Sequence, residues 1–276
     1  MSKVELPFSL RYFIDGCGFS DFCDDLELEY RKHYSNHKID HSSGGSSGSG
    51  KVGDLERRWY NSLVNGSPDY TVYNDPFYLC DLWLCWKLYS RKGLIDVTNP
   101  KLNPYADKYT GMSVLDLGCG LGITSALLME RIISSRVVGT NLIETFQYPV
   151  IQRLGLHYGF DVAETSLNLG HFDIIFASEY FEHIETPIKH LQELIEANTP
   201  SWVICANGFN GRAIGHFTHY HHLGIQYPAS EMSRMFNSEL LSCGFDKVKT
   251  TIWNNRPAVW HRTNIRHKSG HQPRLF

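Results

Sequence analysis

The chain has 276 residues, of which 42% are apolar and 13% aromatic, enough for one large domain or for one domain with an elaboration. Its net charge of −3 and its pI near 6.5 exclude a chain that is basic throughout, although a local basic patch remains compatible with them. The N-terminus lacks a signal-peptide pattern, and the most apolar window contains Asp81 and Lys87, so we expect no membrane span. The seven cysteines include no C-x-x-C pair. We therefore expect reduced thiols in a cytoplasmic protein, without a disulfide framework or a structural zinc site.

The N-terminal part of the sequence divides into three segments. Residues 1–41 are acidic between Asp15 and Glu29, and a short helix with interleaved aromatic side chains is the only structure that they indicate. Residues 42–50 (SSGGSSGSG) have the composition of a flexible linker. This linker is an engineered tether or a natural low-complexity loop, and the sequence leaves both interpretations open. Residues 51–110 are expected to be helical.

Two helices are predicted within residues 51–110. The first covers Asp54 to Leu63. The second starts with Asp75 as its N-cap and Pro76 at its first position, and it ends before Gly93. Apolar side chains recur along this second helix at helical spacing, which favours core packing over a ligand platform; they are Leu79, Leu82, Trp83 and Trp86.

Residues 113–125 (SVLDLGCGLGITS) are the most informative stretch of the chain. An apolar run interrupted only by Asp116 predicts a short buried strand, and helix-forming residues begin at Ile123. Between them lie three alternate glycines, Gly118, Gly120 and Gly122. Glycines let the backbone approach a ligand closely, and the helix that follows directs free N–H groups towards it.

This Asp-x-Gly-x-Gly-x-Gly pattern resembles the first motif of the class I S-adenosylmethionine-dependent methyltransferases. The resemblance implies an α/β fold, in which a Rossmann-like, mostly parallel seven-stranded sheet has helices on both faces and an N-terminal helical elaboration. It places the S-adenosylmethionine-binding domain at residues 111–262 and gives residues 51–110 the position of a lid and substrate region. Tyr70, Tyr73 and Asn74 are the lid candidates.

The downstream chain alternates strands and helices, as a parallel sheet with helices on both faces requires. A helical segment with a break or kink at Pro149 is predicted from Leu142 to Tyr158, and two closing antiparallel strands follow Gly244. Residues 263–276 form a basic tail, either a solvated end or an arm that contacts phosphate. The predicted parallel strands are Val114–Leu117, Arg136–Thr140, Phe160–Ala163, Phe172–Ala177 and Trp202–Ala206, and further helices are Pro187–Ala197 and Ser230–Ser242.

Ligands bind beyond the carboxyl ends of parallel strands, so each strand end contributes candidates for cofactor binding. The resemblance implies that the glycine turn, with Cys119, meets the methionine part of S-adenosylmethionine, and that Asp116 reaches its ammonium group. After the second strand the family usually has an acidic residue for the ribose, whereas this chain has Asn141, which accepts one hydrogen bond and donates another without charge. The remaining cofactor candidates are Glu164 and Thr165 at the adenine, and Ser178 and Glu179 at the sulfonium.

Residues 177–187 (ASEYFEHIETP) are similar to the segment after the fourth strand in the ubiquinone-biosynthesis O-methyltransferases and their relatives. Methyl transfer to oxygen requires removal of a proton, and His183 has a suitable pKa for a general base, with Glu182 beside it. Alternatively, these side chains bind Mg²⁺ or another divalent metal that lowers the acceptor's pKa. A third interpretation is that Glu179 and Glu182 only form the wall of the cofactor pocket.

The metal hypothesis also has a family resemblance. The small-RNA 3′-end 2′-O-methyltransferases use Glu-x-x-Glu-His with a distant histidine to hold Mg²⁺ or Mn²⁺. In this chain that pattern would use Glu179, Glu182 and His183, with His222 as the fourth ligand and His219 and His221 as alternatives. The same histidine-rich segment lies where relatives build an acceptor-pocket loop.

The sequence therefore predicts an S-adenosylmethionine-dependent methyltransferase that acts on oxygen, or alternatively on nitrogen, of a small or medium-sized acceptor. Two alternatives are a metal-dependent 2′-O-methyltransferase acting on nucleic acid and a non-catalytic binding module that retains the methyltransferase fold. The sequence does not indicate an oligomeric state.

Overall fold

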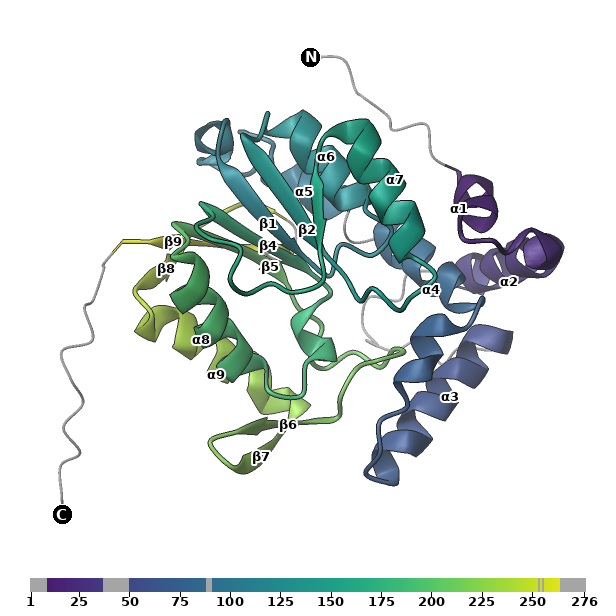
Figure 1. The fold of residues 1–276 in the computed structure, drawn as a ribbon. Helices are drawn as coiled ribbons and strands as arrows, with labels where there is room; N and C mark the ends of the chain where they lie inside the picture. The colour runs from purple at the N-terminus through teal and green to yellow at the C-terminus, as the bar shows by residue number, and fades with distance from the viewer. Residues whose placement is uncertain (1–8, 37–49, 88–90, 253, 255, 264–276) are drawn as a thin grey trace.

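The structure is a computed structural model that describes the chain except residues 1–8, 37–49, 88–90, 253, 255 and 264–276 (Figure 1). Residues 42–49 of the predicted linker and 264–276 of the predicted basic tail therefore lie outside the described residues. Among the helices that are described, none combines the length and the apolar character needed to cross a bilayer.

Seven strands form one sheet in the order β3-β2-β1-β4-β5-β9-β8. The first five are mutually parallel, and β9 is antiparallel to both β5 and β8. This confirms the predicted mostly parallel Rossmann-like sheet. The strand order reverses between β1 and β4, so the carboxyl ends of these strands flank the position where such sheets bind ligands. The strands are β1 (Ser113–Leu117), β2 (Arg136–Thr140), β3 (Asp161–Ala163), β4 (Ile174–Ser178), β5 (Trp202–Ala206), β8 (Phe245–Lys247) and β9 (Ala258–Arg262).

Helices cover both faces of this sheet (Figure 1). α5 (Arg91–Val97), α6 (Ile123–Arg131) and α7 (Tyr148–Tyr158) pack together on one side, and α8 (Pro187–Asn198) and α9 (Ala229–Ser242) lie on the other. The helix predicted from Leu142 begins only at Tyr148. Pro149 lies in its first turn, where its missing N–H has no helical partner to lose, so it starts the helix and does not kink it.

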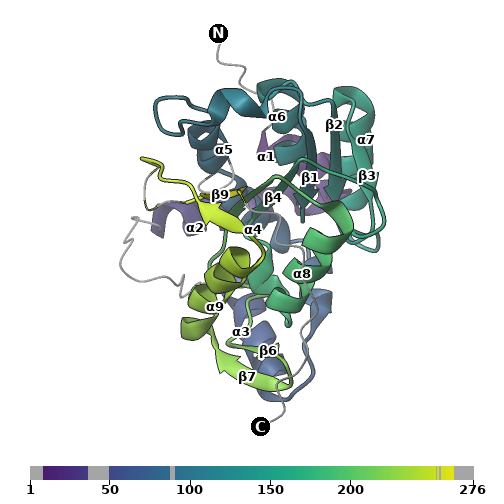
Figure 2. The same ribbon diagram turned by 90° about the vertical axis from the view of Figure 1, so that its left-hand side faces the viewer.

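The N-terminal helical elaboration is also confirmed. In both views α3 (Gly50–Val64) lies at the same end of the molecule as the hairpin formed by β6 (His219–His222) and β7 (Ile225–Pro228) (Figure 2). Of the helix predicted from Pro76 to before Gly93, α4 ends at Cys85, residues 88–90 lie outside the described residues, and Gly93 lies inside α5 and not after the end of a helix. The elements before the sheet are α1 (Leu10–Gly16), η1 (Ser20–Phe22), α2 (Cys23–Asn36), α3 (Gly50–Val64), η2 (Tyr70–Asn74), α4 (Tyr78–Cys85) and η4 (Ala106–Tyr109).

The histidine-rich segment, interpreted from sequence as a pocket loop, contains a β-hairpin. β6 (His219–His222) pairs antiparallel with β7 (Ile225–Pro228) through a two-residue connection. Both connecting residues have positive φ, 50° at Leu223 and 76° at Gly224. That combination gives the tight turn whose twist matches an antiparallel pair.

α6 packs onto β1 and β2 through a small buried polar contact. Asp116 of β1 is 2% exposed, and its Oδ2 accepts a hydrogen bond from Ser125 Oγ at 2.6 Å. Gly139 is opposite Asp116 on β2, and a Cβ there would lie 2.7 Å from Ser125 Oγ and 2.9 Å from Cys119 Sγ. Burial raises the pKa of Asp116 to about 7, partly offset by the Ser125 hydrogen bond. A glycine at position 139 is thus required for α6 to approach the sheet.

We expect Gly139→Ala to lower the free energy of unfolding by about 1–3 kcal/mol, because the added methyl forces α6 away from the sheet. Urea denaturation measures this change. Gly16→Ala is the matched control, since the nearest atom to its new Cβ belongs to the flexible end of the Arg153 side chain. Equal stability of the two variants would contradict the packing described here.

A second prediction concerns Asp116→Asn. Because the folded state raises the pKa of Asp116 from 3.8 to about 7, its contribution to stability is present below about pH 4 and is lost as the pH rises through 7. Between pH 5 and 8 the free energy of unfolding should fall more for the wild type than for the variant, by on the order of 2–3 kcal/mol. Urea denaturation across this range measures both profiles, and parallel profiles would refute the prediction.

Candidate functional site

The glycine turn joins β1 to α6 in a conformation that favours glycine. The φ angles are 59° at Gly118, 56° at Gly120 and 80° at Gly122, which is the N-cap of α6. Within the described chain, the only atom that comes within 4 Å of a Cβ built on Gly120 is Leu82 Cδ2, at 3.8 Å. The middle of the turn therefore faces open space next to α4, as the binding of a cofactor against its backbone requires.

Hydrogen bonds connect this turn to the end of β2. Cys119 N–H donates to the Thr140 carbonyl at 2.9 Å, and Asn141 Nδ2 donates to the Gly120 carbonyl at 2.8 Å. The Asn141 amide also donates to Gln147 Oε1 and accepts from the Leu142 N–H. Both the nitrogen and the oxygen of this amide thus form hydrogen bonds within the protein, so Asn141 positions the turn. Its contact with the ribose stays a prediction.

The other predicted cofactor residues lie around the same edge. Asp116 is buried beneath the turn, bonded to Ser125, and supports the turn from inside. Glu164 and Thr165 are exposed directly after β3, and Ser178 is half-buried as the last residue of β4. Their roles at the adenine and the sulfonium remain predictions that agree with these positions.

Two carboxylates of the predicted acceptor segment lie directly after β4. Glu179 has a φ of 54°, and its backbone N–H donates to the Ala206 carbonyl at 2.8 Å. Glu182, in the short helix η5 (Phe181–His183), is fully buried, and its Oε1 accepts from the Gly208 N–H at 2.5 Å. Its Oε2 is buried without a hydrogen-bond partner among the described residues. A buried carboxylate oxygen in that state is ready to accept a ligand.

A buried histidine faces these carboxylates. Within the described chain, Glu179, Glu182 and His216 have ligand atoms that all lie within 4.8 Å of one another. His216 Nδ1 lies 2.8 Å from the Gly211 carbonyl, which can only accept, so Nδ1 carries the proton and Nε2 keeps its lone pair. A backbone carbonyl on the second nitrogen is the usual support of a metal-binding histidine. The donor set therefore fits a divalent ion such as Mg²⁺ or Mn²⁺.

The predicted ligands His183 and His222 are not in this group of described residues. His183 Nδ1 lies 3.1 Å from the Tyr73 hydroxyl, and its ring stacks edge-on against His216 with a centroid separation of 4.8 Å. His222 lies on β6 in the hairpin. Tyr73, a lid candidate from the sequence, thus contacts the predicted general base, whereas Tyr70 and Asn74 are exposed.

Burial sets the charge state of this cluster. It raises the pKa of Glu179 to about 7, with the Glu182 carboxylate adding to the shift and Arg256 opposing it. Burial also raises the pKa of Glu182 and lowers that of His216, and it holds the pKa of His183 well below its ordinary value. Both imidazoles are therefore neutral near pH 7, the state in which a histidine accepts a proton or binds a metal.

Sequence reasoning missed His216, Arg256 and Gly208. Arg256 Nη2 lies 2.5 Å from Glu179 Oε1, across about eighty residues of chain, and no local sequence signal marks this ion pair. His216 lies in the same histidine-rich segment as the predicted ligand His222. Its position before the hairpin, next to the small residue Gly215, is the signal that could have distinguished it from the histidines on β6.

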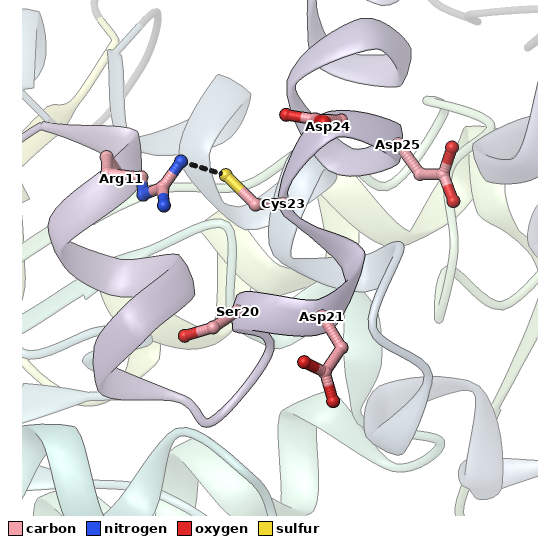
Figure 3. Close-up of a pocket in the computed structure, with 6 residues that line it drawn as sticks. All are labelled: Arg11, Ser20, Asp21, Cys23, Asp24 and Asp25. Atoms are coloured by element: carbon pink, nitrogen blue, oxygen red, sulfur yellow. Dashed lines mark hydrogen bonds between the residues drawn. The ribbon is translucent and has the colours of Figure 1, made fainter.

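A separate pocket of about 420 Å³ lies between α1 and α2 (Figure 3). Arg11 Nη1 points to Cys23 Sγ at 2.5 Å, and the rest of the wall is acidic or small. None of the predicted site residues belongs to it. The lining residues are Arg11, Ser20, Asp21, Cys23, Asp24 and Asp25.

Comparison with known proteins finds methyltransferases. A family model described as a methyltransferase domain matches residues 92–237. The trans-aconitate 2-methyltransferase of Rhodopseudomonas palustris (strain BisB18) is 29% identical over 97 residues, which cover 33% of this chain. The matched part spans only 36% of that relative's length.

Solved structures are also similar, though distantly. The N-methyltransferase NodS from Bradyrhizobium japonicum WM9, in complex with S-adenosyl-L-homocysteine, has a TM-score of 0.42 and 12% identity, covering 76% of this chain and 99% of that one. The ribosomal protein L11 methylase of Lactobacillus delbrueckii subsp. bulgaricus has a TM-score of 0.40 and 16% identity, covering 63% and 78%. The family match extends from α5 to α9 and includes the glycine turn and the carboxylate pair. The chain thus belongs to the methyltransferase-domain family, and residues 92–237 form a class I, S-adenosylmethionine-dependent methyltransferase domain.

Proposed function

We propose that the protein transfers a methyl group from S-adenosylmethionine to an oxygen atom of a small or medium-sized acceptor. The observation that carries this proposal is the convergence at one sheet edge of an open glycine turn and a neutral histidine pair. The turn lies at the end of β1, and His183 and His216 lie beside the end of the adjacent β4. Bound S-adenosylmethionine supplies an electrophilic methyl group on a sulfonium.

The protein's own residues would position the acceptor and take its proton. Methyl transfer is an in-line displacement with a good neutral leaving group, so orientation of the acceptor oxygen is the main requirement. As that oxygen forms its bond to the methyl carbon, its proton passes to an imidazole nitrogen. His216 Nε2 has the free lone pair that this step needs, and His183 is the alternative base predicted from the sequence.

The charge around the site bears on the class of acceptor. The relative from Rhodopseudomonas palustris is named for trans-aconitate, a tricarboxylate, as its acceptor. In this chain Glu179 and Glu182 face the site, and burial raises the pKa of Asp81 on α4 to about 7, with the Glu56 and Glu179 carboxylates adding to the shift. A polyanionic acceptor would bring further negative charge to these buried carboxyl groups, which is unfavourable. A neutral hydroxyl compound fits the site better.

We expect S-adenosyl-L-homocysteine to bind the wild type and to bind Asn141→Ala about tenfold more weakly, because the variant loses the bond that holds the Gly120 carbonyl. Isothermal titration calorimetry measures both affinities. Asn65→Ala, at an exposed site after α3, is the control and should bind like the wild type. Absence of binding to the wild type at millimolar ligand would refute the proposed cofactor use.

A second candidate function is a metal-dependent 2′-O-methyltransferase that acts on nucleic acid. It is favoured by the cluster of Glu179, Glu182 and His216, by the unpartnered Glu182 Oε2, and by the proton position on His216. These residues would hold a divalent ion, which lowers the pKa of a bound hydroxyl and so removes the need for a strong base.

The two histidines of one segment provide a matched test of this candidate. We expect His216→Ala to abolish binding of Mn²⁺, whereas His222→Ala, which changes a histidine outside the group, should retain it. Electron paramagnetic resonance of free Mn²⁺ measures the bound fraction. Methyl transfer to a 3′-terminal ribose of a short RNA should also stop in EDTA, and transfer that continues unchanged in EDTA would exclude the metal-dependent function.

A further inference from the structure

Arg256 is the positive charge of the carboxylate cluster. It precedes β9, and its Nη2 lies 2.5 Å from Glu179 Oε1. A Cβ built on Gly208 would lie 3.0 Å from Arg256 Nη2, 3.1 Å from Glu182 Oε1 and 3.3 Å from Glu179 Oε2. The guanidinium and both carboxylates therefore surround the same small space over Gly208, which is available only because residue 208 has no side chain.

Arg256 offers one positive charge to two carboxyl groups, Glu179 and Glu182. Burial, with the Glu182 carboxylate adding to the shift, raises the pKa of Glu179 to about 7, so near neutral pH a proton compensates part of the second negative charge. Glu179 is 14% exposed and Glu182 is fully buried, so water compensates little of the remainder. A divalent cation would balance both carboxylates by itself.

Arg256 and a metal ion would both use the Glu179 carboxylate. Arg256 Nη2 already contacts Glu179 Oε1, and a divalent ion bound at roughly 2.0–2.6 Å from either oxygen of that carboxylate would lie close to the guanidinium. Two cations in contact would also repel each other strongly in a poorly solvated site. The Arg256 side chain is 35% exposed, so a route to solvent is open to it.

We propose that Arg256 is a resident cation that occupies the carboxylate pair and is displaced when a divalent metal binds. This inference rests on the second candidate function, the metal site of Glu179, Glu182 and His216. The displaced arginine would move away from Glu179 and leave the two carboxylates and His216 as the ligand set. The free energy of metal binding to the wild type is then the free energy gained by the ion minus the free energy lost when Arg256 leaves Glu179.

The test is Mn²⁺ binding to the full chain, measured by electron paramagnetic resonance. Arg256→Gln removes the competing charge, and we expect it to bind Mn²⁺ about tenfold more tightly than the wild type, or tighter still. Arg256→Lys keeps a positive charge and should bind as weakly as the wild type. The matched control is Arg136→Gln. Arg136 is the first residue of β2 and lies away from the carboxyl ends of the strands, so the variant should leave the Mn²⁺ affinity unchanged.

Two further measurements locate the effect. Glu179→Gln combined with Arg256→Gln should lose the tight binding, because the double variant lacks a ligand. In the wild type, saturating Mn²⁺ should raise the rate at which phenylglyoxal modifies Arg256 several-fold, with Arg136 as the internal reference. This second measurement needs no variant, so it decides the question even where Arg256→Gln does not fold.

Unchanged or weaker Mn²⁺ binding by a folded Arg256→Gln variant, or an Arg256 modification rate that Mn²⁺ does not change, would overturn the proposal. Mn²⁺ binding by the wild type together with either of these results would leave the metal site standing and remove only the role of Arg256. If no variant binds Mn²⁺, both the inference and the metal-dependent candidate fail. Binding of S-adenosyl-L-homocysteine by the same samples reports separately on the cofactor site.

Discussion

The connection between the glycine turn and the end of β2 is the constraint on which the rest of the site depends. The Cys119 N–H and the Asn141 amide fix the turn from one side, and buried Asp116 supports it from beneath through Ser125. With the turn held, α6 must begin directly after its N-cap Gly122, and its first N–H groups lie at the edge where β1 ends. A sheet with the same strand order but a loose turn would present no backbone surface to a cofactor.

The N-terminal helices complete the site from the other side. Trp59 of α3 donates its indole N–H to the His216 carbonyl at 2.7 Å, and Tyr73 of η2 contacts His183. A Cβ on Gly215 would overlap both the Tyr73 hydroxyl and His183 Nδ1, so glycine at that position is what allows the contact. The residues before the family match therefore help to place both histidines, and the methyltransferase domain does not build this side alone.

Strong local signals made the sheet predictable. β2 and β5 were placed to the residue, because each is a short apolar run between clear turn signals, and the glycine pattern located the turn. The end of α4 at Cys85 was missed, since the apolar stripe of the sequence continues through Trp86. The hairpin was missed because Leu223-Gly224 is an uncommon pair for a tight turn, in which a leucine adopts positive φ.

The parts of the site that depend on distant contacts could not be predicted in this way. The local sequence identifies Glu179 and Glu182 but not Arg256, which lies before β9 and contacts Glu179. The choice among the four histidines between residues 216 and 222 requires three-dimensional distances. A sequence motif states which groups are available for chemistry. Only the packing of β4, β5 and β9 decides which of them meet.

The same packing suggests why two carboxylates are useful in a methyl-transfer site. The sulfonium of S-adenosylmethionine is positive before transfer and neutral afterwards, and the proton released by a hydroxyl acceptor carries that charge to a base. With His216 as the base, the positive charge would move towards Glu179 and Glu182, whose ligand atoms lie within 4.8 Å of the imidazole. Fixed negative charge stabilises an imidazolium that forms beside it, and more so where water is scarce. A resident Arg256 reduces this stabilisation, so the Glu179–Arg256 ion pair would set the strength of the base. A metal ion bound by His216 would instead take the lone pair that the base needs.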